Sequence, residues 1–343
     1  MFDGESVLVT GGTGSFGRAF VAEVLKRYEP RRLIVYSRDE LKQFEMQEDF
    51  HTPCMRYFIG DVRDEARLRM AMRGVDRVVH AAALKQVPAA EYNPMECIKT
   101  NVMGAQNVVQ AAINNNVKSV VALSTDKAAN PINLYGATKL CSDKLFTAGN
   151  NLAGSGCTRF SVVRYGNVLG SRGSVVPYFM RLLSGGAKEL PITDPRMTRF
   201  WITLKQGVDC VLRAFERMVG GEIFVPKLPS ARITDMASAV APDVPLRVVG
   251  VRPGEKLHEV MCPADDARFV LEFGDHYVIR PAIFFGTDGY ETNRLGEHGT
   301  PVSPDFEYCS GTNYWFLSVD EIREMIRLNL PDGVGSSHEW SPE

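Results

Sequence analysis

The sequence SVLVTGGTGSFG, residues 6–17, passes from a short apolar run into a glycine-rich turn. Residues 6–10 are typical of a buried parallel strand, and residues 19–27 continue with helical periodicity. Gly11, Gly14 and Gly17 therefore lie between a strand and a helix, the context of a dinucleotide-binding fingerprint. Such glycines let the backbone approach a pyrophosphate, and the helix N-terminus offers that anion free N–H groups.

Strand and helix patterns alternate through the first half of the chain. Further strands are predicted at residues 32–37, 55–62, 77–83, 117–125 and 159–170, and a helix is predicted at 101–113. This alternation predicts an α/β fold, a Rossmann-type doubly wound parallel sheet, with ligands at the carboxyl ends of the strands. We expect residues 1–165 to form the cofactor domain and 166–343 mainly a smaller lobe that closes over a substrate, with some segments returning to the first domain.

The second half of the chain shows weaker patterns. Residues 190–203 are rich in proline and predict a loop, whereas 221–226 predict a strand. Residues 246–259 predict a strand, a turn and the start of a helix. Beyond residue 263 we expect polar, irregular structure, except for a helix at 318–328 that Ser318 caps.

Composition excludes several classes of protein. The net charge of −2 indicates neither a nucleic-acid nor a membrane partner. The seven cysteines show no Cys-x-x-Cys and no metal-ligand spacing to the six histidines, so we expect no metal and no disulfide framework. With no apolar run long enough to span a bilayer and no signal-peptide pattern, we expect a cytoplasmic protein.

The end of the second predicted strand indicates which dinucleotide binds. Ser37, Arg38 and Lys42 favour NADP, because a basic side chain here accommodates a 2′-phosphate, whereas Asp39 favours NAD. An exposed charged turn could hold the same residues.

Later strand ends suggest contacts with the rest of the cofactor. Asp61 is placed to hydrogen-bond an adenine edge, and the small Ala81 and Ala82 leave room for a flat ring. Lys85 lies just beyond and could face the cofactor or a substrate phosphate.

Residues 124–139, STDKAANPINLYGATK, supply candidate catalytic groups. Tyr135 and Lys139 are four residues apart, which places them on one face of a helix. A nearby ammonium lowers the pKa of a tyrosine, so the pair could act as a tuned proton acceptor. The alternative is an amphipathic helix with a solvated lysine. Asp126 and Lys127 end the strand at 117–125 and reach the same sheet edge.

The chain resembles the extended short-chain dehydrogenase/reductase family in TGGTGSFG at 10–17, DV at 61–62, HAAA at 80–83 and YGATK at 135–139. Within that family it is similar to the inverting UDP-N-acetylglucosamine 4,6-dehydratases, which begin pseudaminic acid synthesis. The features that carry this closer likeness are STDKAANP at 124–131, RYGNVLGSRGSVVP at 164–177, MTRFWI at 197–202, RPGEKLHE at 252–259 and YETNRLG at 290–296.

The resemblance implies a role for each catalytic candidate. Tyr135 takes the proton of the sugar C4 hydroxyl, Thr125 hydrogen-bonds the C4 oxygen and Lys139 supports Tyr135. Lys127, as a neutral amine favoured by burial and by the Lys139 charge, removes the C5 proton. Asp126, as a carboxylic acid, protonates the departing C6 hydroxyl. NADP is tightly bound and recycled, because the hydride taken from C4 returns to C6, and Lys127 implies inversion at C5.

The resemblance also implies the ligand contacts and the assembly. The implied cofactor contacts are Gly11, Thr13, Gly14, Ser15, Phe16, Gly17, Ser37, Arg38, Asp39, Glu40, Leu41, Lys42, Asp61, Val62, Ala81, Ala82, Lys85, Tyr135, Lys139 and Val168. The implied contacts with UDP-N-acetylglucosamine are Lys85, Asn167, Arg172, Val175, Arg199, Arg252 and Glu255. Family members usually associate, so we expect a homo-oligomer, either a dimer or a hexamer.

Two alternatives remain open on sequence grounds. A retaining dehydratase, a nucleotide-sugar 4-epimerase or a reductase of the same fold would use Tyr135 and Lys139, but an epimerase or reductase has no need of Asp126 and Lys127. A non-catalytic NADP-binding sensor would need none of these catalytic groups.

Overall fold

A computed structural model describes residues 1–154, 158–171, 173–283 and 289–330. The chain divides into two compact units. The larger unit comprises residues 1–165, 207–227 and 260–308, and the smaller unit comprises 166–206, 228–259 and the C-terminal residues from 309.

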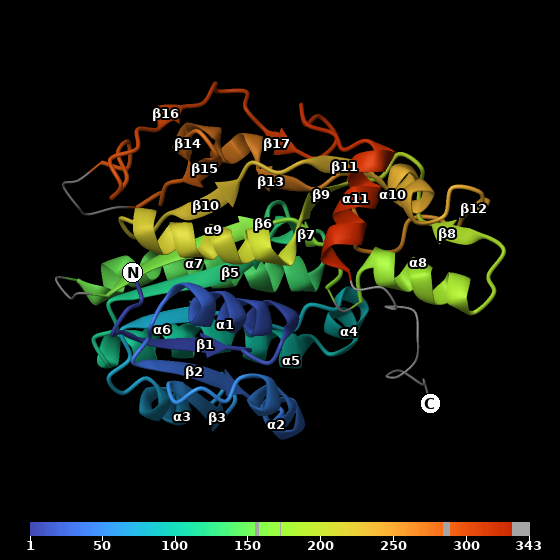
Figure 1. Cartoon of the computed structure of the whole chain (residues 1–343). Helices are drawn as coiled ribbons and strands as arrows, with labels where there is room; N and C mark the ends of the chain where they lie inside the picture. The colour runs from blue at the N-terminus through green and yellow to red at the C-terminus, as the bar shows by residue number, and fades with distance from the viewer. Residues whose placement is uncertain (155–157, 172, 284–288, 331–343) are drawn as a thin grey trace. The chain divides into compact units, whose positions relative to one another are not determined.

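The larger unit is built on one ten-stranded sheet (Figure 1). Its parallel strands, in spatial order, are β10 (Ile223–Pro226), β6 (Arg159–Tyr165), β5 (Ser119–Thr125), β4 (Arg77–His80), β1 (Ser6–Thr10), β2 (Arg32–Ser37) and β3 (Met55–Ile59). Beyond β10 the sheet continues with antiparallel β15 (His276–Ile279), β14 (Val270–Glu272) and β16 (Thr300–Pro301). The predicted doubly wound α/β fold is confirmed.

Helices cover both faces of this sheet. On one face lie α1 (Ser15–Arg27) and α9 (Leu204–Arg217), where the Phe2 ring contacts Phe20 and Phe215 (Figure 1). On the other, α3 (Glu65–Ala71), α6 (Gly104–Asn114) and α7 (Leu134–Ala153) pack side by side. The remaining helices of this unit are α2 (Glu40–Asp49), α4 (Val87–Tyr92) and α5 (Pro94–Ile98).

Sequence chemistry explains these elements locally. Val7, Leu8 and Val9 of β1 are fully buried, as expected for a parallel strand covered on both faces. Burying each such side chain stabilises the fold by about 1.5–3 kcal/mol. Helix α7 begins after Asn133, whose side chain accepts a hydrogen bond from the Gly136 N–H at 2.7 Å.

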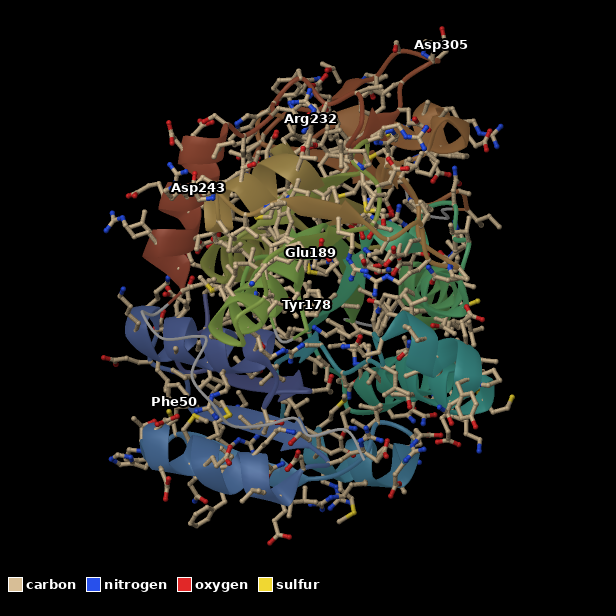
Figure 2. The ribbon with its side chains drawn as sticks, turned by 90° about the vertical axis from the view of Figure 1, so that its right-hand side faces the viewer. Phe50, Tyr178, Glu189, Arg232, Asp243 and Asp305 are labelled. Carbon is tan, nitrogen blue, oxygen red and sulfur yellow. The ribbon has the colours of Figure 1, made fainter. Side chains whose placement is uncertain are left out.

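Within the described residues, the smaller unit holds short strands and three helices of its own. A three-stranded sheet joins β7 (Asn167–Val168), β9 (Thr198–Ile202) and β11 (Ser230–Arg232), and β8 (Leu190–Ile192) pairs with β12 (Leu246–Val248). Buried Trp201 is the centre of a core closed by α8 (Val175–Ser184), α10 (Ile233–Val240) and α11 (Val319–Asn329). Figure 2 shows Tyr178 on α8 and Arg232 at the end of β11.

Several sequence predictions need correction. Residues 190–203 are not a loop, because they contain β8 and β9, and no helix starts within 252–259. The region beyond 263 is not irregular, since β14, β15 and β16 extend the main sheet. Strands β3, β4 and β6 end earlier than predicted. The Ser318 cap of α11 is confirmed as a capping box with Glu321.

Candidate active site

The turn between β1 and α1 brings two pieces of backbone very close together. Gly11 has a φ of +65°, and a Cβ added there would lie 2.9 Å from the Ala82 backbone. A Cβ on Gly17 would lie 2.3 Å from the Gly12 carbonyl oxygen. Both glycines are therefore required by the close packing of this turn. The turn leads into the N-terminus of α1, which has no side-chain cap, so its free N–H groups suit the pyrophosphate of a dinucleotide.

The ends of β2 and β3 gather the residues predicted to bind the adenosine half of the cofactor. Arg38 is half exposed, and its Nη1 lies 3.6 Å from Asp61 Oδ2. Burial acts to raise the pKa of Asp61, but hydrogen bonds from Arg63, together with the charges of Arg63 and Arg38, hold that pKa below its usual range. Asp39 caps α2 by accepting hydrogen bonds from the Lys42 N–H at 3.0 Å and from Lys42 Nζ at 2.6 Å. Asp39 thus has a structural role besides the predicted one.

The end of β5 presents Thr125, Asp126 and Lys127 as predicted. Asp126 is fully buried, and its Oδ1 accepts hydrogen bonds from Thr125 Oγ1 at 2.9 Å and from Lys127 Nζ at 3.0 Å. Its Oδ2 has no hydrogen-bond partner within the described residues. A buried carboxylate oxygen without a partner is costly, so this atom is suited to hold a proton or to meet a ligand.

The Asp126 carboxylate, at hydrogen-bond distance, stabilises the ammonium form of Lys127. The neutral amine expected at the moment of proton removal from C5 stays a prediction.

Tyr135 and Lys139 lie on α7, and both are almost completely buried. Burial raises the pKa of Tyr135 to about 12, and the Lys127 charge and a hydrogen bond with Thr125 oppose that rise only in part. Lys127 is thus an ammonium that acts on Tyr135 in the free protein, and the expected support of Tyr135 by Lys139 stays a prediction. Lys139 Nζ donates to the Leu123 carbonyl of β5 at 2.7 Å. Burial lowers the pKa of Lys139, and the Asp143 carboxylate opposes this effect.

Asn101 is a site residue that the sequence predictions missed. It lies in a π-helix, Lys99–Met103, that runs into α6, and π-helical turns are frequent at functional sites. Its amide accepts from the Leu84 N–H at 2.8 Å and donates to the Leu84 carbonyl at 2.9 Å and to Thr138 Oγ1 at 3.0 Å. Asn101 thus fastens the segment leading to Lys85 against α7. A polar amide at a buried position of a predicted helix is the only signal that could have found it.

The substrate contacts predicted near residues 166–259 lie in the smaller unit, except Arg172, which is outside the described residues. Asn167 and Val168 form β7, and Val175 begins α8. Arg199 is 11% exposed, and its guanidinium donates to the carbonyls of Thr198, Lys256 and Leu257 at 2.7–3.0 Å. Arg252 is 70% exposed and lies 3.1 Å from Glu255.

The described residues contain neither a metal-binding cluster nor a membrane-spanning helix. No group of three or more histidine, cysteine, aspartate or glutamate side chains that could hold a metal occurs there. In that same part of the chain, no helix is long and apolar enough to cross a membrane.

Comparison with known proteins identifies relatives along nearly the whole chain. The polysaccharide biosynthesis protein family model matches residues 7–281. A Campylobacter jejuni protein, UDP-N-acetylglucosamine 4,6-dehydratase (inverting), is 60% identical over 95% of this chain and 98% of its own length. A Rickettsia akari protein named UDP-glucose 4-epimerase is 45% identical over 95% of this chain and 96% of its own length.

Solved structures show the same fold. Pen from Bacillus thuringiensis superposes with a TM-score of 0.86 at 35% identity, covering 96% of this chain and 98% of that one. DesIV from Streptomyces venezuelae, a dTDP-glucose 4,6-dehydratase with NAD and TYD bound, has a TM-score of 0.67 at 24% identity, over 74% of this chain and 86% of its own. With its glycine-lined turn, its Tyr135–Lys139 helix and this coverage, the chain belongs to the polysaccharide biosynthesis protein family, among the extended short-chain dehydrogenases/reductases.

Proposed function

We propose that this chain is an NADP-dependent UDP-N-acetylglucosamine 4,6-dehydratase that inverts the sugar at C5. One observation carries the proposal: the buried Asp126 carboxylate lies 3.0 Å from Lys127 Nζ. The charges of both groups also act on the pKa of Tyr135. An acid and a base beside a tyrosine are what an elimination coupled to alcohol oxidation requires. The C. jejuni relative that bears this name supports the same substrate and outcome.

Tyr135 begins the reaction by accepting the proton of the C4 hydroxyl. In the free protein its phenol is neutral at pH 7, because burial raises its pKa to about 12. A bound cofactor carries a positive nicotinamide ring, which favours the phenolate in the same way as the Lys127 charge. Thr125 hydrogen-bonds the C4 oxygen, and Lys139 supports Tyr135 from the next turn of α7.

The Asp126–Lys127 pair carries out the elimination. Lys127 Nζ donates a hydrogen bond to Asp126 Oδ1 at 3.0 Å, so a proton can pass directly from one group to the other. That transfer provides the carboxylic acid and the neutral amine that the elimination needs. The amine then removes the C5 proton, the C5–C6 double bond forms, and the acid protonates the C6 hydroxyl, which leaves as water. The ion pair is thereby restored, ready for the next turnover.

The N-terminus of α1 suits a dinucleotide because it follows a close-packed glycine turn and has no side-chain cap to satisfy its N–H groups. We assign Thr13, Ser15 and Phe16 to the phosphates, Arg38 and Lys42 to a 2′-phosphate, and Asp61 to the adenine. A bound nicotinamide would supply the hydride acceptor for C4 and the hydride donor for C6, so that the cofactor would not be consumed. Inversion follows if C5 receives its new proton on the face opposite to Lys127.

The remaining assignments rest on the family resemblance. We assign substrate contacts to Lys85, Asn167, Arg172, Val175, Arg199, Arg252 and Glu255, and we assign the smaller unit as the substrate lobe. We further propose that the protein acts in the cytoplasm as a homo-oligomer and that its product enters pseudaminic acid synthesis.

A nucleotide-sugar 4-epimerase is the second candidate, favoured by the R. akari relative. An epimerase returns the hydride to C4 and needs only Tyr135 and Lys139. It has no use for a buried carboxyl group that can carry a proton to a leaving hydroxyl. The Asp126–Lys127 contact therefore separates the two candidates.

Proton NMR of the reaction with UDP-N-acetylglucosamine and NADP⁺ in deuterated water tests the proposal. A new C6 methyl signal, with couplings of the L-arabino configuration, is the expected result. A D-xylo product would contradict inversion. UDP-N-acetylgalactosamine without a methyl signal would identify an epimerase. That result would also contradict the elimination roles proposed for Asp126 and Lys127.

A further inference from the structure

We propose that Asp143, together with Ser124 and Arg164, is a positioning residue that holds the end of β5 and the Lys139 ammonium in register for the reaction. None of the three was singled out as a site residue by the sequence. The inference rests on the proposed function, because it concerns the same catalytic groups.

The first argument is the geometry of α7. Tyr135, Lys139 and Asp143 follow one another at steps of four residues, so they share one face of the helix. All three side chains are at least nine-tenths buried. The face that carries the proposed proton acceptor therefore also carries a buried carboxylate two turns along.

Second, the same face of α7 makes two hydrogen bonds to β5. Asp143 Oδ2 accepts a hydrogen bond from Ser124 Oγ at 2.8 Å, and Lys139 Nζ donates to the neighbouring Leu123 carbonyl at 2.7 Å. Two consecutive residues of β5 are thus fastened to α7. The next residues along the chain are Thr125, Asp126 and Lys127. These two hydrogen bonds therefore fix the position of the backbone from which the reacting side chains extend.

The third argument is charge. Asp143 also accepts from Arg164 Nη2 of β6 at 3.0 Å, and the other arm of Arg164 donates to the Met261 carbonyl at 2.8 Å. Arg164 and Asp143 are 2% and 1% exposed. Buried charges of this kind require a partner. Asp143 therefore neutralises Arg164 and also presents a negative charge to Lys139.

The groups that act on Lys139 come from several elements. Asp143 on α7 and His80 on β4 interact electrostatically with Lys139. Arg164 on β6 pairs with Asp143, and Tyr165 on β6 interacts with Tyr135, on which the Asp126 and Lys127 charges also act. Burial lowers the pKa of His80 to about 3, so this ring is neutral at pH 7. Within the described residues, Asp143 is the group that favours the charged form of Lys139 against burial.

The test compares the wild type with Asp143→Asn and Ser124→Ala. Asp143→Asn keeps the shape but removes the charge, so Lys139 loses its proton at lower pH. We expect the alkaline limb of the kcat profile to move down by about one pH unit or more. Ser124→Ala removes one fastening bond without changing charge, so kcat should fall about tenfold with the alkaline limb unmoved and KM for UDP-N-acetylglucosamine within about twofold.

Ser142→Ala is the matched control, because Ser142 is the buried neighbour of Asp143 and its Oγ has no hydrogen-bond partner within the described residues. It should keep the wild-type profile. An unmoved alkaline limb in Asp143→Asn, with wild-type kcat in Ser124→Ala, would overturn the inference. Should Asp143→Asn fail to fold, wild-type kcat in Ser124→Ala is sufficient to overturn it. Failure of the proposed function is distinguishable, because the wild type would then form no 4-keto sugar.

Discussion

Arg38 is the single side chain that we expect to set the choice of cofactor if the chain uses NADP as proposed. It lies at the end of β2 with its guanidinium 3.6 Å from Asp61 and half of its side chain exposed, so it is accessible to a 2′-phosphate. A hydrogen bond to a charged group contributes about 1.5–3 kcal/mol, which corresponds to roughly 10–150-fold in affinity. Arg38→Ala should therefore weaken NADP⁺ binding by that factor and leave NAD⁺ binding unchanged.

Calorimetric titration with both cofactors measures this preference. Arg56→Ala is the matched control. Arg56 lies near the start of β3, whereas the predicted ribose site lies at the carboxyl end of the neighbouring β2. Equal loss of NADP⁺ and NAD⁺ affinity in Arg38→Ala would contradict a 2′-phosphate contact.

At the level of single residues, the sequence predicted that the proposed catalytic groups lie together, but it did not predict the residues around them. Thr125, Asp126 and Lys127 are adjacent in the chain, so their proximity needed no fold. Asn101 and Asp143 contact partners 17–37 residues away, a relation that only the folded chain creates. The pKa of Tyr135 was predicted in the wrong direction for the free protein, because spacing reports a neighbouring ammonium but not the extent of burial.

At the scale of elements, the β1–α1 junction depends on the absence of side chains. A Cβ at Gly17 would meet the Gly12 backbone at 2.3 Å, which leaves no flexible group to move aside. Gly17→Ala should lower the free energy of unfolding by about 1–3 kcal/mol and weaken NADP⁺ binding by more than about tenfold.

Gly207→Ala is its control within another helix, because nothing lies within 4 Å of a Cβ added there. Alanine at that helical position should raise stability by about 0.5–1 kcal/mol without changing cofactor affinity. Urea unfolding and calorimetric titration measure both quantities. Normal NADP⁺ affinity in Gly17→Ala would show that the α1 N-terminus does not hold the pyrophosphate.

The elements that sequence predicted well are long or strongly patterned. β1, β2 and α11 match their predictions closely, because they combine apolar periodicity with clear boundary residues. β8, β14 and β15 are strands of three or four residues, too short for a period to emerge. Their strand state comes from pairing with distant segments such as β12 and β10. Pro253 and Gly254 explain why the predicted helix after residue 252 does not form.

At the scale of the whole molecule, buried neutral groups set a pH window for stability. Burial lowers the pKa of His80 to about 3, so its contribution is complete above its unfolded pKa of about 6.5 and is lost as the pH falls below that value. Burial raises the pKa of Tyr135 to about 12, so its contribution is complete below about pH 10 and is lost between about 10 and 12. Complete loss of the His80 contribution would lower the free energy of unfolding by on the order of 4–5 kcal/mol, and complete loss of the Tyr135 contribution by on the order of 3 kcal/mol.

Urea unfolding across this range should therefore give a plateau between about pH 7 and 9.5 with a decrease on either side. Tyr135→Phe should reduce the alkaline decrease, and His80→Gln should reduce the acid one. Decreases of wild-type size in both variants would mean that other groups control the window.

The central claim is that Asp126 and Lys127 exchange one proton to drive the elimination. Lys127→Arg tests it, because arginine keeps the charge but does not deprotonate in proteins. The decisive measurement is the absorbance of reduced nicotinamide after UDP-N-acetylglucosamine is added to this variant, with C6 methyl formation followed in parallel. The account predicts that reduced cofactor accumulates and no methyl group forms, since C4 oxidation proceeds without elimination. Methyl formation at the wild-type rate would contradict it.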